Sequence, residues 1–385
     1  MAGFSSPSRR STRTRHGIAR PVAIAGLAHR LNTDENLSSC PSPSQEVENM
    51  KRQIPLWIGM ALFLSYLCCV PPGAAQSPGA AGSKIITGEI RIPEISGAAF
   101  LPEDRLLVVA DEGQTVFLLE QATQRLLTGT VAETDFKKIS LKDQLKGADG
   151  KTREVDDLED VAWDRQSNVF LVTSHSQNRR GKSPAKRRAI VRMILGPDGL
   201  KPDAVFDLKE PSELQKATER TPAQAGFNIE GAAWSQDGRL LLGLRSPTQT
   251  VDEERKPNED AILLEVEELS AAPLKATAIK PALDLKGGGI RGMFYDLEEH
   301  GLWIVAGLSP DPPDGIVEKA SVALWFRHDN GTLERRELPE EVKNGLANVE
   351  AVTRISVGAA KQPHLLLVED GTQASKYVLF PVPKQ

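Results

Sequence analysis

Glutamate and arginine residues recur at one position of a repeated sequence pattern. The segment Asn228 to Pro247 reads "NIEGAAWSQDGRLLLGLRSP", with Glu230 before a short apolar stretch and Arg245 after a second one. Aligning the related segments places five residues at the position of Glu230, namely Ser96, Glu159, Glu230, Arg291 and Glu350. If the repeats surround a common axis, these side chains face one another across it.

Such a ring of side chains has three chemical interpretations, which the sequence leaves open. Carboxylate oxygens are the ligands that Ca²⁺ and Mg²⁺ prefer, so Glu159, Glu230 and Glu350 could hold such a cation. Alternatively, like charges at close range raise one carboxyl pKa and make Glu159 and Glu230 an acid–base pair for hydrolysis. The third interpretation is structural, with each glutamate capping backbone amides at the turn into its own repeat. The cationic Arg291 at the same position favours a functional interpretation over the structural one.

A second candidate is the segment "TSHSQNRRGKSPAKRRAIVR", which begins at Thr173. His175 stands at the end of an apolar strand beside Ser174, and we expect it to take part in catalysis at the same mouth. The basic loop that follows contains Arg179 and Arg180. Arginine makes bidentate contacts with phosphate, sulfate or carboxylate groups. The segment therefore predicts anion binding by Ser174, Arg179 and Arg180, together with Arg245 and Arg291 from related positions in other repeats. A solvated hairpin loop is the simpler alternative for the basic run.

Composition excludes several classes of protein. The chain of 385 residues has a formal net charge of −5, which argues against a nucleic-acid-binding surface. Its three cysteines all precede residue 76, so the rest of the chain has no thiolate nucleophile and no cysteine-ligated zinc. The sequence contains no G-x-S-x-G elbow, no H-E-x-x-H motif and no P-loop. Whether the protein is an enzyme stays open at this stage.

The first 75 residues differ in character from the remainder. Residues 1–49 are rich in Ser, Arg and Pro, which predicts a disordered or mis-assigned extension. Residues 50–75 begin with a basic pair, continue as an apolar run and end in small residues, which is the pattern of a secretory signal peptide starting near Met50. We therefore expect a single secreted or periplasmic domain over residues 76–385. A membrane anchor is the alternative for the apolar run.

The repeats predict an all-β fold of the β-propeller type. Segments like the opening one begin at Glu94, Asp157, Asn228, Gly289 and Asn348, separated by roughly 60 to 70 residues. Each continues into a third β-type strand and a more polar fourth stretch, such as "QRLLTGTVAE" in the first repeat. Four antiparallel strands of falling apolarity describe one propeller blade. Two β-sandwiches are the structural alternative.

Five blades account for the repeats. The last repeat stops after its third strand, and the strand-like segment Lys84 to Pro93 could complete that blade and close the ring. The polar segment Phe136 to Asp156 is expected to be a helix-and-loop insertion. If it hides a degenerate blade instead, the ring has six blades.

The strings "DLEDVAWD", "FLVTSHSQNRRGKSPAKRRAIVRM", "NIEGAAWS", "LLLGLRSP" and "GGGIRGM" resemble the bacterial domain-of-unknown-function family 3616. The resemblance covers roughly Glu89 to Pro383 and implies a secreted or periplasmic setting, without implying an activity. More distantly, the repeated glutamate–glycine opening is similar to phytase-like and esterase-like propellers. That likeness implies a phosphoesterase acting on an anionic substrate, but the chain lacks the multi-aspartate calcium pattern of propeller phytases.

Two classes of function follow from these patterns. The first is a secreted propeller that binds an anionic small molecule at its channel mouth, as a cation-assisted phosphoesterase in its catalytic form. The second is a non-catalytic propeller that binds another protein of the bacterial envelope. Its membrane contact would be confined to the signal peptide.

Overall fold

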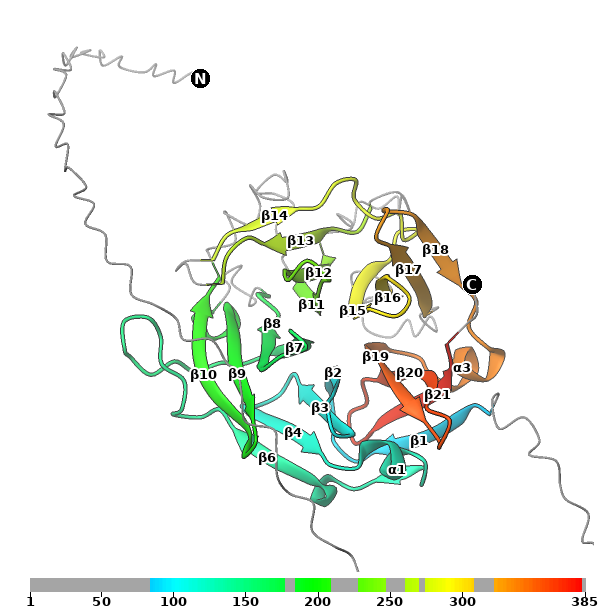
Figure 1. Cartoon of the computed structure of the whole chain (residues 1–385). Coiled ribbons are helices and arrows are strands. Elements are labelled where there is room, and N and C mark those ends of the chain that lie inside the picture. The colour runs from blue at the N-terminus through cyan, green and yellow to red at the C-terminus, as the bar shows by residue number, and fades with distance from the viewer. Residues whose placement is uncertain are drawn as a thin grey trace, which may run out of the picture. The chain divides into compact units, whose positions relative to one another are not determined.

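Five β-sheets follow one another around a ring in the computed structural model (Figure 1). The structure describes residues 84–176, 184–208, 228–246, 260–269, 274–307 and 322–382. All of them belong to one compact unit, Ala74–Gln385. Each sheet is one blade, so the prediction of a five-bladed β-propeller is confirmed. The predicted signal peptide and the predicted extension before it lie outside the described residues.

Four of the sheets contain four strands each, and neighbouring strands in these sheets follow the order of the chain. The first contains β2 (Ile95–Leu101), β3 (Arg105–Ala110), β4 (Thr115–Leu119) and β6 (Phe136–Ser140). The second contains β7 (Leu158–Trp163), β8 (Asn168–Thr173), β9 (Ala189–Gly196) and β10 (Gly199–Asp207). The third contains β11 (Asn228–Trp234), β12 (Leu240–Ser246), β13 (Leu263–Val266) and β14 (Ala276–Ala278). The fourth contains β15 (Gly289–Asp296), β16 (Gly301–Gly307), β17 (Ala323–His328) and β18 (Leu333–Arg336).

The fifth sheet combines strands from both ends of the described chain. It contains β19 (Val349–Val357), β20 (Gln362–Glu369), β21 (Ser375–Pro381), β1 (Ile86–Ile90) and β5 (Thr130–Val131). β1 pairs with β21 in antiparallel register and with β5 in parallel register. Two short α-helices, α1 (Ala122–Leu126) and α3 (Glu340–Gly345), lie in connections. Among the described residues, no helix is long and apolar enough to cross a membrane.

The expected fourth strand of the first blade was wrong. The stretch "QRLLTGTVAE" contains the end of α1 and the two-residue strand β5, which pairs with β1 of the fifth sheet rather than with β4. β6, from the segment expected to be an insertion, pairs with β4 instead. Its Phe136 and Ile139 are buried while the lysines between them are exposed, so the polar composition of the segment reflects a partly exposed outer strand.

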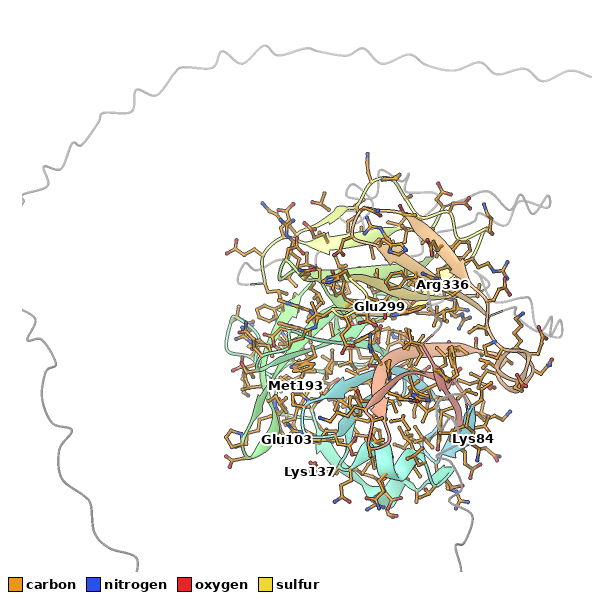
Figure 2. The ribbon with its side chains drawn as sticks, turned by 45° about the vertical axis from the view of Figure 1, so that its right-hand side comes forward. Lys84, Glu103, Lys137, Met193, Glu299 and Arg336 are labelled. Atoms are coloured by element: carbon orange, nitrogen blue, oxygen red, sulfur yellow. The ribbon has the colours of Figure 1, made fainter. Side chains whose placement is uncertain are left out.

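The hydrophobic core consists of five clusters, one between each pair of neighbouring sheets. Consecutive residues of a middle strand enter different clusters: Leu106 packs toward the fifth sheet and Leu107 toward the second. These strands are therefore buried on both faces, which is why their sequences are continuously apolar. Side chains on the outer strands, such as Lys137, are exposed, whereas Met193 is buried between blades (Figure 2).

The inner strands approach one another so closely at the axis that only small residues fit there. A Cβ atom added to Gly97 on β2 would lie 2.5 Å from the Cα of Asp160 on β7, and one added to Gly292 on β15 would lie 2.3 Å from the carbonyl oxygen of Glu350 on β19. Because both obstacles are backbone atoms, neither can move aside without shifting a strand. The equivalent positions in the other blades are Gly231 and Ala351, leaving Asp160 as the one larger residue of this layer.

The carboxylate of Asp160 joins three blades at this layer. The backbone N–H of Ala232 on β11 donates to its Oδ2 at 2.6 Å, and that of Met293 on β15 donates to the same oxygen at 3.3 Å. The N–H of Val161 donates to Oδ1 at 2.8 Å. Asp160 is 1% exposed, and burial raises the pKa of its carboxyl group, opposed by these three hydrogen bonds. It therefore satisfies amide groups that inner strands of two other blades turn toward the axis.

We expect the substitution Asp160→Ala to lower the free energy of unfolding by roughly 3–5 kcal/mol, because it leaves buried amides of β7, β11 and β15 without an acceptor. Urea denaturation measures the change. The matched control is Asp198→Ala, whose side chain is 82% exposed and should cost less than about 0.5 kcal/mol. Equal effects of the two substitutions would contradict the role given to Asp160.

Candidate functional site

A cavity of about 260 Å³ lies where the five inner strands begin, and every residue that lines it is polar or charged. Six of the lining residues are carboxylic acids: Asp111, Asp157, Glu159, Glu230, Glu350 and Asp370. Three are arginines and three are neutral: Arg187, Arg245, Arg291, Ser176, Asn228 and Asn348. Carboxylic acids thus outnumber arginines two to one, a composition that favours a hydroxyl-rich or cationic ligand over an anion.

A β-bulge in every inner strand places the repeated residue at this cavity. The pairing of each inner strand with its neighbour skips one residue, and the skipped residues are Ser96, Glu159, Glu230, Arg291 and Glu350. A bulge leaves its extra residue outside the ladder and redirects the side chain. Four of the five line the cavity. Ser96 does not, and its hydroxyl donates to the carbonyl oxygen of Leu158 at 2.5 Å.

Buried ion pairs connect the third, fourth and fifth blades around the cavity. Arg245 donates to Oε1 of Glu230 at 2.6 Å. Arg291 donates to Oε1 of Glu350, and its Nη1 lies 3.9 Å from Oε2 of Glu230. The four side chains are between 4% and 11% exposed. The guanidinium group of Arg291 therefore lies between two glutamates. Its positive charge offsets theirs, which explains why this repeat has an arginine where three others have a glutamate.

Asparagines support the two arginine-bound glutamates from the same repeats. The amide of Asn228 donates to Glu230 Oε1 at 2.6 Å, and that of Asn348 donates to Glu350 Oε1 at 3.2 Å. Asn348 also donates to Asp370 at 3.2 Å. These asparagines were missed by reasoning from the sequence. The sequence did contain a signal, because an asparagine precedes the bulged glutamate by two residues in both repeats.

Glu159 differs from the other two glutamates because the described residues offer it no hydrogen bond or ion pair. It lines the cavity and is 8% exposed. Burial, followed by the charges of Glu230 and Asp157, raises the pKa of its carboxyl group well above the usual range. A raised pKa favours the protonated form of this carboxyl group, which can then donate a proton. Glu159 and Glu230 thus occupy equivalent positions in different electrostatic environments.

His175 and Ser174 lie behind the cavity rather than in it. Both are fully buried, and neither is among the residues that line the cavity. Ser174 donates to Oδ2 of Asp157, which also accepts from Ser176 at 2.9 Å and lies 3.1 Å from Nη1 of Arg187. Ser174 therefore positions Asp157, which reasoning from the sequence missed, and Arg187 is the residue of the predicted basic loop that lines the cavity.

The other residues predicted at the site are arginines for anion binding and glutamates for metal binding. Arg179 and Arg180 lie outside the described residues. Arg245 and Arg291 line the cavity, but both are ion-paired with glutamates. Within the described part of the chain, no group of three or more His, Cys, Asp or Glu side chains is arranged to hold a metal ion. The Ca²⁺ or Mg²⁺ site predicted at Glu159, Glu230 and Glu350 stays a prediction, and an EDTA arm in the assay below tests it.

A double-mutant cycle tests the ion pair between Arg291 and Glu350. We expect Arg291→Gln alone to lower the free energy of unfolding by roughly 3–5 kcal/mol, because it leaves a buried carboxylate without its partner. Adding Glu350→Gln should recover part of this loss. The exposed pair Arg91 and Glu89, 3.0 Å apart, is the control and should show a coupling of about 0–1 kcal/mol. A coupling as small as the control's would contradict the proposed interblade pairing.

Asp111 makes stability at this end of the axis depend on pH. Burial, followed by the charges of Glu94 and Asp370, raises its pKa from 3.8 to about 7. Between these pH values the unfolded chain has released a proton that the folded protein retains, so the free energy of unfolding falls as pH rises from about 4 to about 7.

The substitution Asp111→Asn removes this penalty. We expect the free energy of unfolding of the variant, relative to that of the unsubstituted protein, to be roughly 1–3 kcal/mol higher at about pH 8 than at about pH 4.5. Urea denaturation at both pH values measures the change, with the exposed Asp198→Asn as control. A difference between variant and parent that does not change with pH would show that Asp111 titrates normally.

Comparisons with known proteins assign no family to this chain. No protein-family model matches the chain, and no curated protein matches it. Among solved structures, the PQQ-bound aldose sugar dehydrogenase of Streptomyces coelicolor is 16% identical, over 78% of this chain and 98% of that one, with a TM-score of 0.37. Virginiamycin B lyase of Staphylococcus aureus is 10% identical, over 77% and 100%, with a TM-score of 0.35. The allergen Mala s 1 of Malassezia sympodialis is 13% identical, over 75% and 78%, with a TM-score of 0.36. At these values the similarity does not extend to a reaction, and the resemblance to family 3616 stays a prediction.

Proposed function

We propose that the carboxylate-rich cavity is the active site of a hydrolase for uncharged, hydroxyl-rich substrates such as glycosides. The observation that carries the proposal is the contrast between two equivalent glutamates. Glu159 is buried, faces the cavity and has no partner among the described residues, whereas Glu230 is held by Arg245 and Asn228. A buried carboxyl group without a partner and a second carboxyl group held beside a cation could serve as the acid and the base of hydrolysis.

The roles follow from these environments. The protonated carboxyl group of Glu159 donates its proton to the leaving-group oxygen as the bond from that oxygen to the sugar carbon breaks. The carboxylate of Glu230 accepts a proton from water as the water oxygen bonds to the same carbon. The products are the free sugar and an alcohol, and both glutamates return to their starting states by exchanging protons with solvent. The guanidinium groups of Arg245 and Arg291 stabilise the charge of Glu230 in the resting site.

The lining favours a neutral substrate over the anionic one expected from the sequence. The arginines that line the cavity are each paired with a carboxylate, Arg187 with Asp157, Arg245 with Glu230 and Arg291 with Glu350. A phosphate entering the cavity would meet six carboxyl groups and would need a cation to offset their repulsion. Asparagine, serine and carboxyl groups, in contrast, both donate to and accept from sugar hydroxyls.

A chromogenic substrate panel tests the proposal. Aryl glycosides, aryl esters and aryl phosphates are each supplied with Ca²⁺, Mg²⁺ or EDTA. We expect turnover of a glycoside that EDTA does not abolish, with kcat/KM falling as pH rises through the raised pKa of Glu159, because the acid must be protonated. Glu159→Gln should lower kcat by roughly 10²–10⁴-fold. The control Glu89→Gln alters a half-exposed side chain on β1 and should leave kcat unchanged.

Two results would contradict the proposal. Hydrolysis confined to phosphates and lost in EDTA would favour the cation-assisted phosphoesterase. No turnover of any substrate, in a protein whose variants all fold, would favour the non-catalytic propeller that binds another envelope protein.

A further inference from the structure

A second cavity, of about 220 Å³, lies at the opposite ends of the inner strands. All five of these strands contribute to its lining, with Ala98, Ala162, Ala232, Met293 and Thr353. Along each strand, the layer of small residues that contains Asp160 comes between the two cavities. At ~30 Å³ per water, the volume corresponds to roughly seven waters, enough for a small organic ligand.

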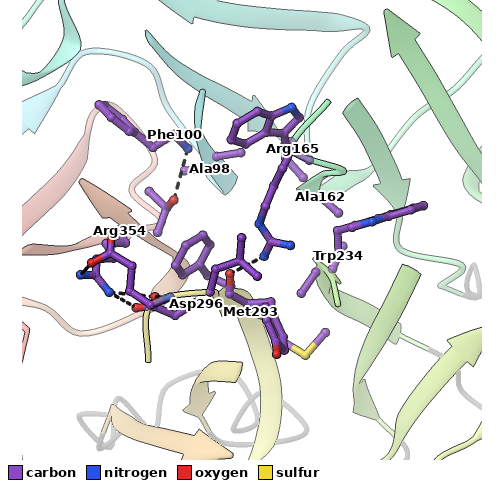
Figure 3. Close-up of a pocket in the computed structure, with 18 of the residues that line it drawn as sticks. Ala98, Phe100, Ala162, Arg165, Trp234, Met293, Asp296 and Arg354 are labelled. Atoms are coloured by element: carbon purple, nitrogen blue, oxygen red, sulfur yellow. Dashed lines mark hydrogen bonds and ion pairs between the residues drawn. The ribbon is translucent and has the colours of Figure 1, made fainter. Parts of the chain in front are cut away.

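The walls of this cavity combine alanines and aromatic residues with charged side chains, unlike the wholly polar lining of the carboxylate-rich cavity. Trp163, Trp234 and Phe294 line it, and Trp234 stacks on Phe170 with the ring centroids 4.9 Å apart, which fixes the orientation of its indole ring. Figure 3 shows Ala98 and Ala162 on two sides of the cavity. Leu297 at the rim is one of the exposed large hydrophobic residues of the described chain. An apolar ligand body would therefore find apolar contacts on several sides.

Arg165 brings a positive charge into these apolar surroundings. It lies on the turn between β7 and β8 and reaches into the cavity (Figure 3). Its Nη2 donates to the carbonyl oxygen of Tyr295 at 2.7 Å, and its guanidinium carbon lies 5.2 Å from the centroid of the Tyr295 ring. The described residues provide no carboxylate within ion-pair distance, and burial lowers the pKa of Arg165.

The neighbouring Arg354 shows what is missing at Arg165. Arg354 donates to both oxygens of Asp296, at 2.8 and 2.6 Å, and also to Glu298. The carboxylate of Asp296 accepts in addition from the indole N–H of Trp303 at 3.2 Å. The acidic side chains of this cavity are thus engaged by Arg354, which leaves the guanidinium of Arg165 with neutral partners among the described residues.

We propose that this cavity is a binding site for a small aromatic carboxylate, independent of the carboxylate-rich cavity. The carboxylate would accept hydrogen bonds from the guanidinium of Arg165, which offers more donors than its bond to Tyr295 uses. The aromatic ring would pack against the alanines and the aromatic side chains that line the cavity. Both halves are needed, because an anion without an apolar body leaves the walls uncovered and an apolar body without an anion leaves the arginine unpaired.

Benzoate is the probe that tests the site, with isothermal titration calorimetry on the full protein as the measurement. We expect saturable binding of benzoate and at least tenfold weaker binding of both benzamide, which lacks the charge, and acetate, which lacks the ring. Arg165→Gln should weaken benzoate binding by roughly 10- to 100-fold, the range for a hydrogen bond to a charged group. Arg165→Lys should recover part of the loss, since it restores the charge without the planar fork. Arg91→Gln, with a side chain that is 62% exposed, is the matched control.

A second variant keeps the test decisive if Arg165→Gln does not fold. Ser356 is exposed at the rim of the cavity, so Ser356→Trp places a bulky side chain over the mouth without disturbing the core. It should weaken benzoate binding while leaving the unfolding midpoint unchanged. Three results would each overturn the proposal: no saturable benzoate binding to the unsubstituted protein, benzamide binding as tightly as benzoate, or benzoate binding that neither Arg165→Gln nor Ser356→Trp alters.

Discussion

The close approach of five inner strands at one axis is the constraint on which the rest of the structure depends. Gly97 and Gly292 leave no room for a Cβ atom beside the backbone of the neighbouring blade, and the carboxylate of Asp160 accepts amide hydrogens from three blades at the same level. This layer fixes the distance between blades. The residue before it in each strand is the bulged one, so the same constraint sets the positions of Glu159, Glu230, Arg291 and Glu350 around the carboxylate-rich cavity.

The two ends of the inner strands carry opposite chemistry because the residues on either side of this layer differ in kind. On one side, bulged acidic and basic residues face one another, and ion pairs form at Glu230 and Glu350, whereas burial raises the pKa of both Glu159 and Glu350. On the other side, alanines and aromatic residues line a second cavity together with Arg165, Arg354 and the acidic partners of Arg354. A single repeated strand thus supplies a wholly polar cavity at its start and a partly apolar one at its end, with Asp160 between them.

The sequence predicted the architecture well and the site in part. Apolar strand pairs with polar turns recur strongly enough to locate five blades, and aligning them identified four residues that do share one cavity. The pairing partners of these residues could not be predicted, because the ion pair of Arg291 with Glu350 joins positions 59 residues apart and depends on how two blades meet. The bulges were also invisible, since a bulge changes strand pairing without changing residue type. The prediction placed His175 at the cavity because it ends a strand there. A side chain at that position can also point behind the cavity, as those of Ser174 and His175 do. The segment that contains β6 was predicted as a helix-and-loop insertion because a partly exposed outer strand has weak apolar character.

The protonation of Glu159 tests the central claim most directly, namely that bulged residues of separate blades converge and leave this carboxyl group buried without a cationic partner. Carbon-13 NMR of protein labelled at the glutamate side-chain carboxyl carbon follows each group through a pH titration, and the spectrum of Glu159→Gln assigns the signal. The convergence predicts that the Glu159 carboxyl group stays protonated well above the pH at which an ordinary glutamate side chain loses its proton. A Glu159 signal that titrates together with those of the exposed glutamates would contradict it.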